Sequence, residues 1–545
     1  MSVSTNHLWW QRGVIYQIYP RSFMDSDGDG VGDLAGIIQR LDYLSDTLGV
    51  DAIWLSPFYP SPMADFGYDV SDYTNVAPVF GDLETFDQLL LRAHQRGLKI
   101  IIDFVPNHSS DQHPWFQNSR SARHNPQRDW YVWADPKPDG SPPNNWLSVF
   151  GGSAWEWDQT TNQYYLHSFL KEQPDLNWRN PQVKEAMFAA LRFWLDRDVD
   201  GFRIDVAHFI MKDPALRDNP LKPTADRTMH KSLGEYDSQI HIHDQGHPDV
   251  HRIYRELRVL LEEYSLSRPR VSIGEIHIFD WDKWASYYGS GLDELHMPFN
   301  FQLLGVEWQA QKVRKIVDSL EAALPPGAWP NYVLGNHDES RLASRLGPHG
   351  ARLAAMLLLT LRGTPTLYYG DEIGMTDVPI SPEEQQDPWG VRVPGLGRDG
   401  CRTPMQWDAS TLAGFTPPGP QRTWLPVAEN FQQVNVEIQL HQPGSLINLY
   451  RKLLAYRKIT PALQIGNYFP IDGVHEDCFA FRRYHPGHPP LIVVLNFSAQ
   501  DLTLELSEHG TGYIVISTNL DREEKVDLPG LHLRKMEGLM IEVDR

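Results

Sequence analysis

The chain has 545 residues, of which 49 are basic and 70 acidic, so its formal net charge is −21. This acidic balance argues against non-specific binding of nucleic acid, which needs a basic surface. The content of 41% hydrophobic residues excludes a disordered chain. At about 150 residues per domain, the length predicts three to four domains, or one large barrel with additions. The two cysteines exclude a disulfide framework and favour a reducing compartment.

The sequence carries no recognisable targeting or membrane segment. Its first 20 residues lack the basic region and apolar run of a signal peptide. No later run approaches the roughly 20 apolar residues of a membrane span. We therefore expect a cytoplasmic protein that has no membrane partner.

Short apolar runs alternate with helical patterns as far as residue 370. The expected strands cover residues 13–20, 51–57, 98–107, 201–207, 270–277, 292–301, 331–338 and 364–370. The expected helices cover residues 33–47, 82–97, 181–197, 250–265, 309–324 and 350–362. Continuous apolar strands joined by helices indicate a parallel sheet buried on both faces. Eight such strands predict an α/β fold, the closed (β/α)8 TIM barrel.

Three segments depart from this alternation. Residues 104–178 are rich in Pro, Asn, Asp and Trp and are too long for a structureless loop, so they predict an inserted small domain after the third strand. The two parts of the barrel are then residues 1–103 and 179–459, the second with a long Pro- and Gly-rich loop at 375–426 and a last helix at 445–458. Alternating apolar residues predict a C-terminal antiparallel β-sandwich over residues 460–545.

Acidic residues recur at the ends of the expected strands, where a barrel places its active site. Asp103 lies at the end of the third strand, Asp205 of the fourth, Glu275 of the fifth and Asp338 of the seventh. Such a set suits glycoside hydrolysis, in which one carboxyl attacks or stabilises the anomeric carbon and another holds a proton. The alternative is that each carboxylate caps the following helix. We consider it weaker, because two histidines and an arginine converge with the acids.

Five segments carry a resemblance to a known family. They are DFVPNH (103–108), QPDLNW (173–178), GFRIDVAHF (201–209), IGEIHI (273–278) and LGNHDESR (334–341). The segments GVIYQIYPRSF, SPMADFGYDVSDY and RDGCRTPMQWD add to it. From about residue 13 to 407, the chain resembles the α-amylase family of glycoside hydrolases (family 13). Within that family it resembles the α-glucosidase and oligo-1,6-glucosidase branch.

The resemblance implies roles for the acidic residues. Asp205 would be the nucleophile, Glu275 the general acid/base and Asp338 the stabiliser of the transition state. A retaining reaction then predicts that the carboxyl groups of Asp205 and Glu275 lie roughly 5–5.5 Å apart. Arg203 would keep Asp205 ionised and pair with Asp103. The implied substrate-binding residues are Asp65, Tyr68, His108, Phe169, Arg203, His337 and Arg398, with Arg402 and Phe150 as second choices. For the aromatic residues among them, the alternative is that their side chains pack in the hydrophobic core.

A Gly-rich loop near the N-terminus places carboxylates on alternate residues. Oxygen ligands at this density suit Ca²⁺, with Mg²⁺ as the alternative, although Gly36 stands where an EF-hand has Glu. The resemblance implies a structural metal with these ligands: the side chains of Asp25, Asp27, Asp29 and Asp33 and the carbonyl of Val31. The competing interpretation is a solvated acidic turn. We expect no organic cofactor.

Four histidines, His241, His243, His247 and His251, gather in one later segment. They lack the HExxH spacing, so we favour a polar loop over a metal site.

Two activities fit these features. The first is a retaining exo-α-glucosidase that releases terminal α-glucose from short α-glucosides of the maltose, isomaltose or sucrose type, with transglucosylation. Asp65 and Arg398 would close the non-reducing end. The alternative is a glucosyltransferase or isomerase, such as a trehalose or isomaltulose synthase, which shares the covalent intermediate. Val206 is associated with α-1,6 activity, whereas the VAHF, IGEIHI and HMPFNFQLL segments resemble maltase-type members, so the linkage stays open.

A third class is disfavoured. Some relatives of the family are non-catalytic partners of membrane transporters, but they have lost the catalytic carboxylates and carry a membrane span. The expected partner is therefore a small-molecule substrate and no nucleic acid, with the chain acting as a monomer or homodimer.

Overall fold

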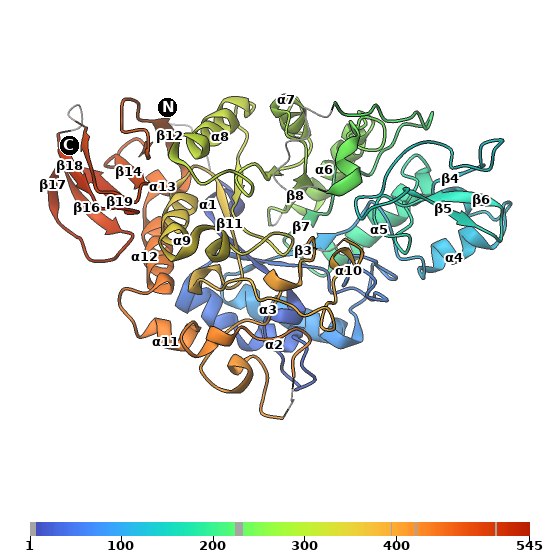
Figure 1. Ribbon diagram of the computed structural model, residues 1–545, viewed down its shortest axis with the longest axis horizontal. Helices are drawn as coiled ribbons and strands as arrows, with labels where there is room; N and C mark the ends of the chain where they lie inside the picture. Colours follow the sequence, from blue (N-terminus) through green and yellow to red (C-terminus); the bar gives the residue numbers. More distant parts are fainter. Residues whose placement is uncertain are drawn as a thin grey trace.

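The computed structural model describes residues 7–223, 233–266, 268–393, 395–419, 422–506 and 510–544. Its centre is a closed barrel with the strand order β1-β11-β10-β9-β8-β7-β3-β2, in which every neighbouring pair is parallel (Figure 1). The strands are β1 (Ile15–Ile18), β2 (Ala52–Leu55), β3 (Lys99–Phe104), β7 (Gly201–Ile204), β8 (Val271–Ile276), β9 (Met297–Asn300), β10 (Asn331–Val333) and β11 (Thr364–Tyr368). Nearly all of their residues are buried, which confirms the predicted barrel and its two covered faces.

The barrel helices follow the predicted alternation. Their starts are set by side-chain caps: Asp82 accepts a hydrogen bond from the backbone N–H of Thr85, and Asn180 from that of Gln182, with Pro181 at the first helical position. The helices of the barrel region are α1 (Trp9–Arg12), α2 (Leu34–Gln39), α3 (Leu83–Gln95), α5 (Pro181–Asp196), α6 (Val250–Tyr264), α7 (Trp281–Ala285), α8 (Ala310–Ala323), α9 (Leu342–Thr360), α11 (Val436–Leu440), α12 (Leu446–Ile459) and α13 (Pro461–Ile465).

Two helices differ from the expected ranges. The helix expected at 33–47 is divided into α2 and a π-helical turn, Tyr43–Leu48, that ends at left-handed Gly49. Buried apolar side chains continue from α2 into the π-helical turn, so the hydrophobic periodicity of the sequence does not reveal the wider turn. The helix expected at 350–362 begins earlier, at Leu342, and is interrupted at Gly347, whose φ is 68°. Glycine adopts this left-handed conformation without steric cost.

The segment between β3 and β7 contains its own small sheet. Helix α4 (Pro114–Ser121) precedes strands β4 (Trp133–Ala134), β5 (Trp155–Asp158) and β6 (Gln163–Leu166), which pair antiparallel in the order β4-β6-β5. A β-bridge between His108 and Asp175 joins the start of the insertion to its end. The insertion is therefore tied back to the barrel next to the residues that follow β3.

The C-terminal segment folds as two antiparallel sheets that enclose a separate apolar cluster. Figure 1 places it at the opposite side of the barrel from β4–β6. Buried Arg483 donates hydrogen bonds to the carbonyls of Leu463 and Gly466, which anchors these sheets to the last barrel helices. The strands are β12 (Asn467–Pro470), β13 (Cys478–Tyr484), β14 (Leu491–Asn496), β15 (Leu502–Glu505), β16 (Thr511–Ser517), β17 (Lys525–Asp527), β18 (Pro529–Leu533) and β19 (Gly538–Val543).

The long loop at 375–426 packs against the carboxyl ends of the barrel strands. It contains the short helix α10 (Pro388–Arg392), and the backbone N–H of Met405 donates to the carbonyl of Ser22 just after β1. Both cysteines, Cys401 in this loop and Cys478 in β13, are buried and unpaired.

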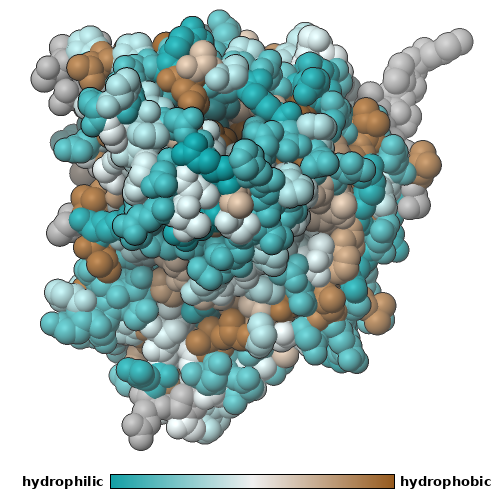
Figure 2. Space-filling view, turned by 90° about the vertical axis from the view of Figure 1, so that its right-hand side faces the viewer, coloured by the Kyte–Doolittle hydropathy of each residue, from teal (hydrophilic) through white to brown (hydrophobic). Residues whose placement is uncertain are grey.

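Among the described residues, no helix combines the length and the apolar character needed to cross a bilayer. The face that carries the inserted segment is mostly hydrophilic, with apolar side chains scattered among polar ones (Figure 2).

Candidate active site

Arg203 gathers three of the predicted carboxyls at the ends of β3, β7 and β8. Its Nη1 donates to Asp103 Oδ1 and to Asp205 Oδ1, each at 2.8 Å, and its Nη2 donates to Glu275 Oε2. We call Asp103, Arg203, Asp205 and Glu275 the Arg203 cluster. All four side chains are at least nine-tenths buried. The expected Asp103–Arg203 pair is confirmed, and Asp205 and Glu275 share one guanidinium.

The Arg203 cluster has fewer positive than negative groups. Burial raises the pKa of Asp103 to about 6 and the pKa of Asp205 well above its usual range, although Arg203 opposes both shifts. Burial also raises the pKa of Glu275, but Arg203 and a hydrogen bond from His277 outweigh it, so the net shift is downward. Because the three carboxyls surround one cation, the protonation of one of them affects the pKa of the others.

The backbone just after Asp205 is strained. Val206 has a φ of 34°, a left-handed value that is a genuine outlier for a β-branched residue. In this conformation the N–H of Val206 donates to Glu275 Oε2 at 3.0 Å, and the N–H of Ala207 donates to the Glu275 carbonyl at 3.0 Å. Strain of this kind is kept where the surrounding structure requires it, and here it couples the ends of β7 and β8.

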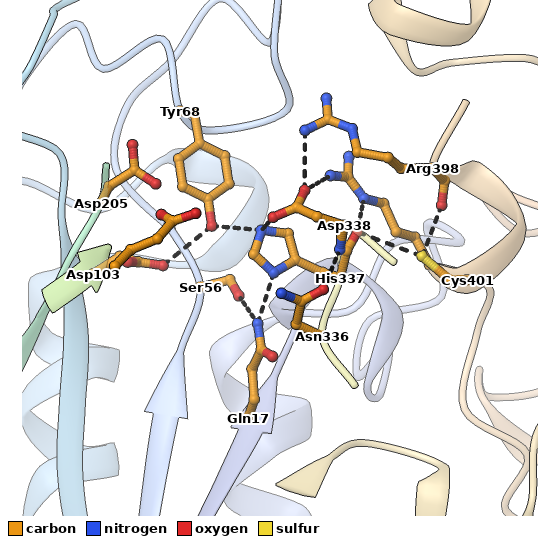
Figure 3. Close-up of polar contacts among 12 residues, drawn as sticks. Gln17, Ser56, Tyr68, Asp103, Asp205, Asn336, His337, Asp338, Arg398 and Cys401 are labelled. Atoms are coloured by element: carbon orange, nitrogen blue, oxygen red, sulfur yellow. Dashed lines mark hydrogen bonds and ion pairs between the residues drawn. The ribbon is translucent and has the colours of Figure 1, made fainter. Parts of the chain in front are cut away.

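A second group of acids and arginines lies on the other side of Tyr68 (Figure 3). Asp338 Oδ1 accepts hydrogen bonds from Arg398 Nη1 at 3.0 Å and from Arg402 Nη2 at 2.9 Å. Arg398 Nη2 also donates to Asp65 Oδ1 at 2.7 Å and to Asp387 Oδ1 at 2.6 Å. We call these five residues the Arg398 cluster. In Figure 3, Asp103 and Asp205 lie on one side of Tyr68, and Asp338 and Arg398 lie on the other.

Charge balance in the Arg398 cluster favours ionised acids. Burial raises the pKa of Asp338, but His337, Arg398 and Arg402 outweigh it and hold the pKa below its usual range. Burial also raises the pKa of Asp387, but Arg398 outweighs burial, so the pKa is lowered to about 2. Asp65 is the exception, because burial raises its pKa despite Arg398.

His337 connects the two clusters through Tyr68. Its Nδ1 accepts a hydrogen bond from Gln17 Nε2 at 2.7 Å, so Nε2 carries the proton and faces the Tyr68 hydroxyl at 2.7 Å (Figure 3). The Tyr68 hydroxyl also lies 3.3 Å from Asp103 Oδ2. Burial lowers the pKa of His337 to about 3, so the ring is neutral at physiological pH.

His108 lies on the side of the inserted segment. Its Nε2 is 3.1 Å from Gln173 Nε2, and the same amide donates to Asp65 Oδ2 at 3.2 Å. Burial lowers the pKa of His108 to about 4. The structure therefore brings His108 and Asp65 together through Gln173, a residue of the quoted segment QPDLNW for which no role was predicted.

The predicted aromatic residues have different surroundings. The half-buried Phe169 ring lies 5.2 Å from the His108 ring, measured between centroids. Phe150 is 3% exposed, packs edge-on against Trp389 at 5.1 Å, and lies under the Arg398 guanidinium. Phe150 thus supports Arg398 from within a small apolar cluster.

The acidic loop near the N-terminus brings three carboxylates together. Oxygens of Asp25, Asp27 and Asp29 lie within 4.8 Å of one another, the only such group of three or more His, Cys, Asp or Glu side chains found among the described residues. Asp33 lies outside this group, since its carboxylate accepts hydrogen bonds from Ser26 and, as the cap of α2, from the N–H of Gly36. The metal and the Val31 carbonyl as its ligand stay predictions.

The four clustered histidines have separate partners. His241 pairs with Asp244 at 2.6 Å, His243 with Asp213 at 3.5 Å and His251 with Glu294 at 2.8 Å. His247 lies 3.4 Å from Asp249. This arrangement agrees with a polar segment rather than a shared metal site.

Sequence reasoning missed several contacts in the site. Gln17 lies in the first strand, within the quoted segment GVIYQIYPRSF, but no role was predicted for it, and Asp387 lies in the long loop outside every quoted segment. His277 stands two residues after Glu275 and contacts Glu275 Oε1 through Nε2 at 2.8 Å. For His277, its position two residues after the predicted acid/base Glu275 was the one signal that the sequence offered.

Comparison with known proteins places the chain in a family. Residues 17–466 match the family model "Alpha amylase, catalytic domain". A probable alpha-glucosidase of Rhizobium meliloti is 43% identical, with 97% of each chain covered. An oligo-1,6-glucosidase of Parageobacillus thermoglucosidasius is 38% identical, with 98% of this chain and 99% of the relative covered.

Solved structures agree. The alpha-glucosyl transfer enzyme XgtA superposes with a TM-score of 0.90 at 43% identity, covering 99% of this chain and 100% of the other. The trehalulose synthase MutB of Pseudomonas mesoacidophila superposes with a TM-score of 0.87 at 35% identity, with the same coverage. With its closed barrel, its acid clusters and these relatives, the chain belongs to the α-amylase family of glycoside hydrolases (family 13), in the α-glucosidase and oligo-1,6-glucosidase branch.

Proposed function

We propose that the protein is a retaining exo-α-glucosidase that releases terminal α-glucose from short α-glucosides and also transfers it to sugar acceptors. The observation that carries this proposal is the shared guanidinium of Arg203. It holds a carboxyl that can attack, Asp205, beside a carboxyl that can deliver a proton, Glu275. Two carboxyls in this relation are the requirement for double displacement at an anomeric carbon.

In the first half-reaction Asp205 attacks C1 of the glucosyl unit. The C1–O bond breaks, its electron pair stays on the departing oxygen, and Glu275 gives that oxygen a proton. In the second half-reaction Glu275 takes a proton from water, the water oxygen bonds to C1, and Asp205 leaves. Two inversions retain the α configuration. A sugar hydroxyl in place of water gives the transfer product.

The cycle requires that the proton of the Arg203 cluster lies on Glu275 when substrate is bound. In the site without substrate, the contact with Arg203 favours ionised Glu275. We propose that the departing oxygen draws the Glu275 carboxyl away from Arg203, so that Arg203 is left to Asp205. The separation of roughly 5–5.5 Å between the carboxyls of Asp205 and Glu275 stays a prediction.

The Arg398 cluster is proposed to hold the glucosyl ring. Ionised Asp338 lies across Tyr68 from Asp205 and contacts neutral His337 (Figure 3), and both would bond sugar hydroxyls more strongly as the ring distorts. His108, Tyr68 and Phe169 would line the same subsite. The Asp65–Arg398 pair would close its far end, which favours a chain end over the middle of a polymer.

We also propose a structural Ca²⁺ in the acidic loop, with Mg²⁺ as the alternative. The grouped carboxylates of Asp25, Asp27 and Asp29 fit a hard cation, because each has lone pairs beyond those that accept loop N–H groups. When bound, the cation would supply positive charge that fixes this loop after β1. The Val31 carbonyl and Asp33 are its remaining proposed ligands.

A glucosyltransferase or isomerase is the second candidate. A trehalulose synthase is among the structural relatives, and both activities use the same glucosyl-enzyme intermediate. They differ in whether water or a sugar hydroxyl reaches C1. The linkage preference stays open, because Val206 and the maltase-like segments point to different linkages.

The proposal is tested by product analysis with maltose, isomaltose, sucrose and trehalose, each with and without an acceptor alcohol. NMR during the first minutes with p-nitrophenyl α-glucoside should show α-glucose as the first product, and β-glucose first would refute retention. Asp205→Asn and Glu275→Gln should lose maltose hydrolysis by on the order of 10⁴-fold. Asp200→Asn is the matched control, since Asp200 is buried at the other end of β7.

A further inference from the structure

A solvent-exposed histidine contacts the proposed acid/base. His277 Nε2 lies 2.8 Å from Glu275 Oε1, and the His277 side chain is 43% exposed, whereas that of Glu275 is 7% exposed. The His277 ring stacks on Phe301, with ring centroids 4.2 Å apart and planes 11° apart. Phe301 in turn packs against Phe299 of β9. The orientation of the imidazole is therefore fixed by an aromatic wall.

The two oxygens of Glu275 have distinct surroundings. Oε2 accepts hydrogen bonds from Arg203 and from the N–H of Val206. Oε1 has His277 as its contact. A carboxyl whose Oε2 already accepts two N–H donors carries its proton on Oε1. The oxygen that must release the proton is thus the one beside His277.

We propose that His277 is a positioning residue that holds Glu275 Oε1 and stabilises the ionised form of Glu275 left after proton transfer. This inference rests on the proposed glucosidase function. In the first half-reaction Glu275 loses its proton to the departing oxygen, and the Nε2–H of His277 can then donate to the new carboxylate. A hydrogen bond to an ionised group is among the stronger ones in proteins, so Glu275 becomes a better acid when a poor leaving group needs one.

Other charged groups also face Glu275, and His277 differs from them in position. Next to His277, β9 and the residue after it contribute the uncharged rings of Phe299 and Phe301. His208 contacts the Glu275 carbonyl through Nδ1 at 3.3 Å, and burial lowers its pKa to about 3, so it stays neutral. The groups facing Glu275 are Arg203, Asp205 and His208 from β7 and the loop after it, Asp103 from β3, Asp338 from the loop after β10, and His277 from its own strand end.

Two substitutions separate the hydrogen bond from the ring stacking. His277→Phe keeps a ring against Phe301 and removes the donor, whereas His277→Gln keeps an N–H donor and removes the ring. His475→Phe is the matched control, because His475 is 45% exposed and lies beside an acid two residues away, Asp477, far along the chain in the C-terminal sheets.

The experiment compares kcat/KM for maltose, whose leaving group needs a proton, with that for p-nitrophenyl α-glucoside, whose leaving group needs little. His277→Phe should lose about tenfold or more with maltose and less than about threefold with the nitrophenyl substrate. The alkaline limb of its maltose pH profile should move to higher pH, because the pKa of Glu275 rises. His277→Gln should recover part of both effects.

The outcomes are distinguishable. Equal losses with both substrates, or His277→Phe behaving like His475→Phe, would overturn the role of His277 while leaving the glucosidase intact. A wild-type protein that hydrolyses neither substrate would overturn the proposed function, and this inference with it. Unchanged thermal unfolding midpoints of the variants would show that the measured differences belong to the site.

Discussion

Two clusters of acids and arginines share the mouth of the barrel, and they differ in charge balance. The Arg203 cluster sets three carboxyls against one guanidinium, and the Arg398 cluster sets three against two. Burial raises the pKa values of Asp103 and Asp205 in the first. The second holds Asp338 and Asp387 below their usual range. In each cluster two of the three acids follow this balance of cations, whereas Glu275 in the first cluster and Asp65 in the second depart from it.

Arg203→Lys should break the first cluster and have the largest effect on activity. Lysine keeps the charge but has no second planar donor, so it cannot hold Asp205 and Glu275 together. We expect kcat/KM for maltose to fall by about 10²–10³-fold. Steady-state kinetics on a folded variant check this, and a loss below tenfold would show that the shared guanidinium is dispensable.

Arg398→Lys should have a smaller effect, because Arg402 still contacts Asp338. The variant loses its simultaneous contacts with Asp65 and Asp387, so we expect a loss of about tenfold to a hundredfold, mainly as a higher KM. A variant that loses kcat with an unchanged KM would contradict a role in holding the sugar ring. Arg392→Lys is a control in the same loop, since Arg392 is partly exposed and contacts Glu172.

Asp205→Asn and Asp338→Asn should shift stability in opposite directions. Because the pKa of Asp205 is raised in the folded state, ionisation of Asp205 at higher pH destabilises the folded protein. Asp205→Asn removes this ionisation, so it should raise the unfolding midpoint by a few degrees, most at alkaline pH. The lowered pKa of Asp338 contributes stability above its ordinary pKa and loses it as the pH falls. Asp338→Asn should therefore lower the midpoint at neutral pH, and the difference should shrink below about pH 4. Thermal unfolding monitored by circular dichroism across pH tests both signs, and shifts in the same direction would refute the comparison.

The acidic loop should give the smallest effect, on stability alone. A cation present at about 100 times its Kd stabilises the folded chain by roughly 2.7 kcal/mol. A chelator should lower the unfolding midpoint and Ca²⁺ should restore it in the wild type, but not in Asp27→Asn. Asp139→Asn, in an exposed turn, should respond like the wild type. No chelator effect on the wild type would leave the loop as a solvated turn.

Much of this architecture follows from patterns that a single sequence carries. Apolar runs and helical periodicity predicted all eight strands, because the parallel sheet buries both faces. The Asp103–Arg203 pair was predictable because both residues lie in familiar motifs at neighbouring strand ends. The loop at 375–426 was less predictable. Asp387, the second acid partner of Arg398, lies in a segment without periodicity, where only the fold brings the partners together.

Backbone detail was also beyond the sequence. Nothing about a valine predicts the φ of 34° at Val206, because the value is imposed by hydrogen bonds to a strand 69 residues later. The π-helical turn at Tyr43–Leu48 kept the buried face that periodicity reports and changed only the hydrogen-bond register. Local patterns reveal which side chains are buried, and long-range contacts decide how the backbone accommodates them.

The late position of Arg398 and Arg402 along the chain has a consequence for biosynthesis. A ribosome delivers the chain from its N-terminus, so Asp65, Asp205, Glu275 and Asp338 all emerge before the two arginines that neutralise the far side of the pocket. A nascent chain that ends before residue 398 would carry the acids without these counter-ions. The contacts of Arg398 and Arg402 with Asp338 therefore form only after residue 402 has been synthesised.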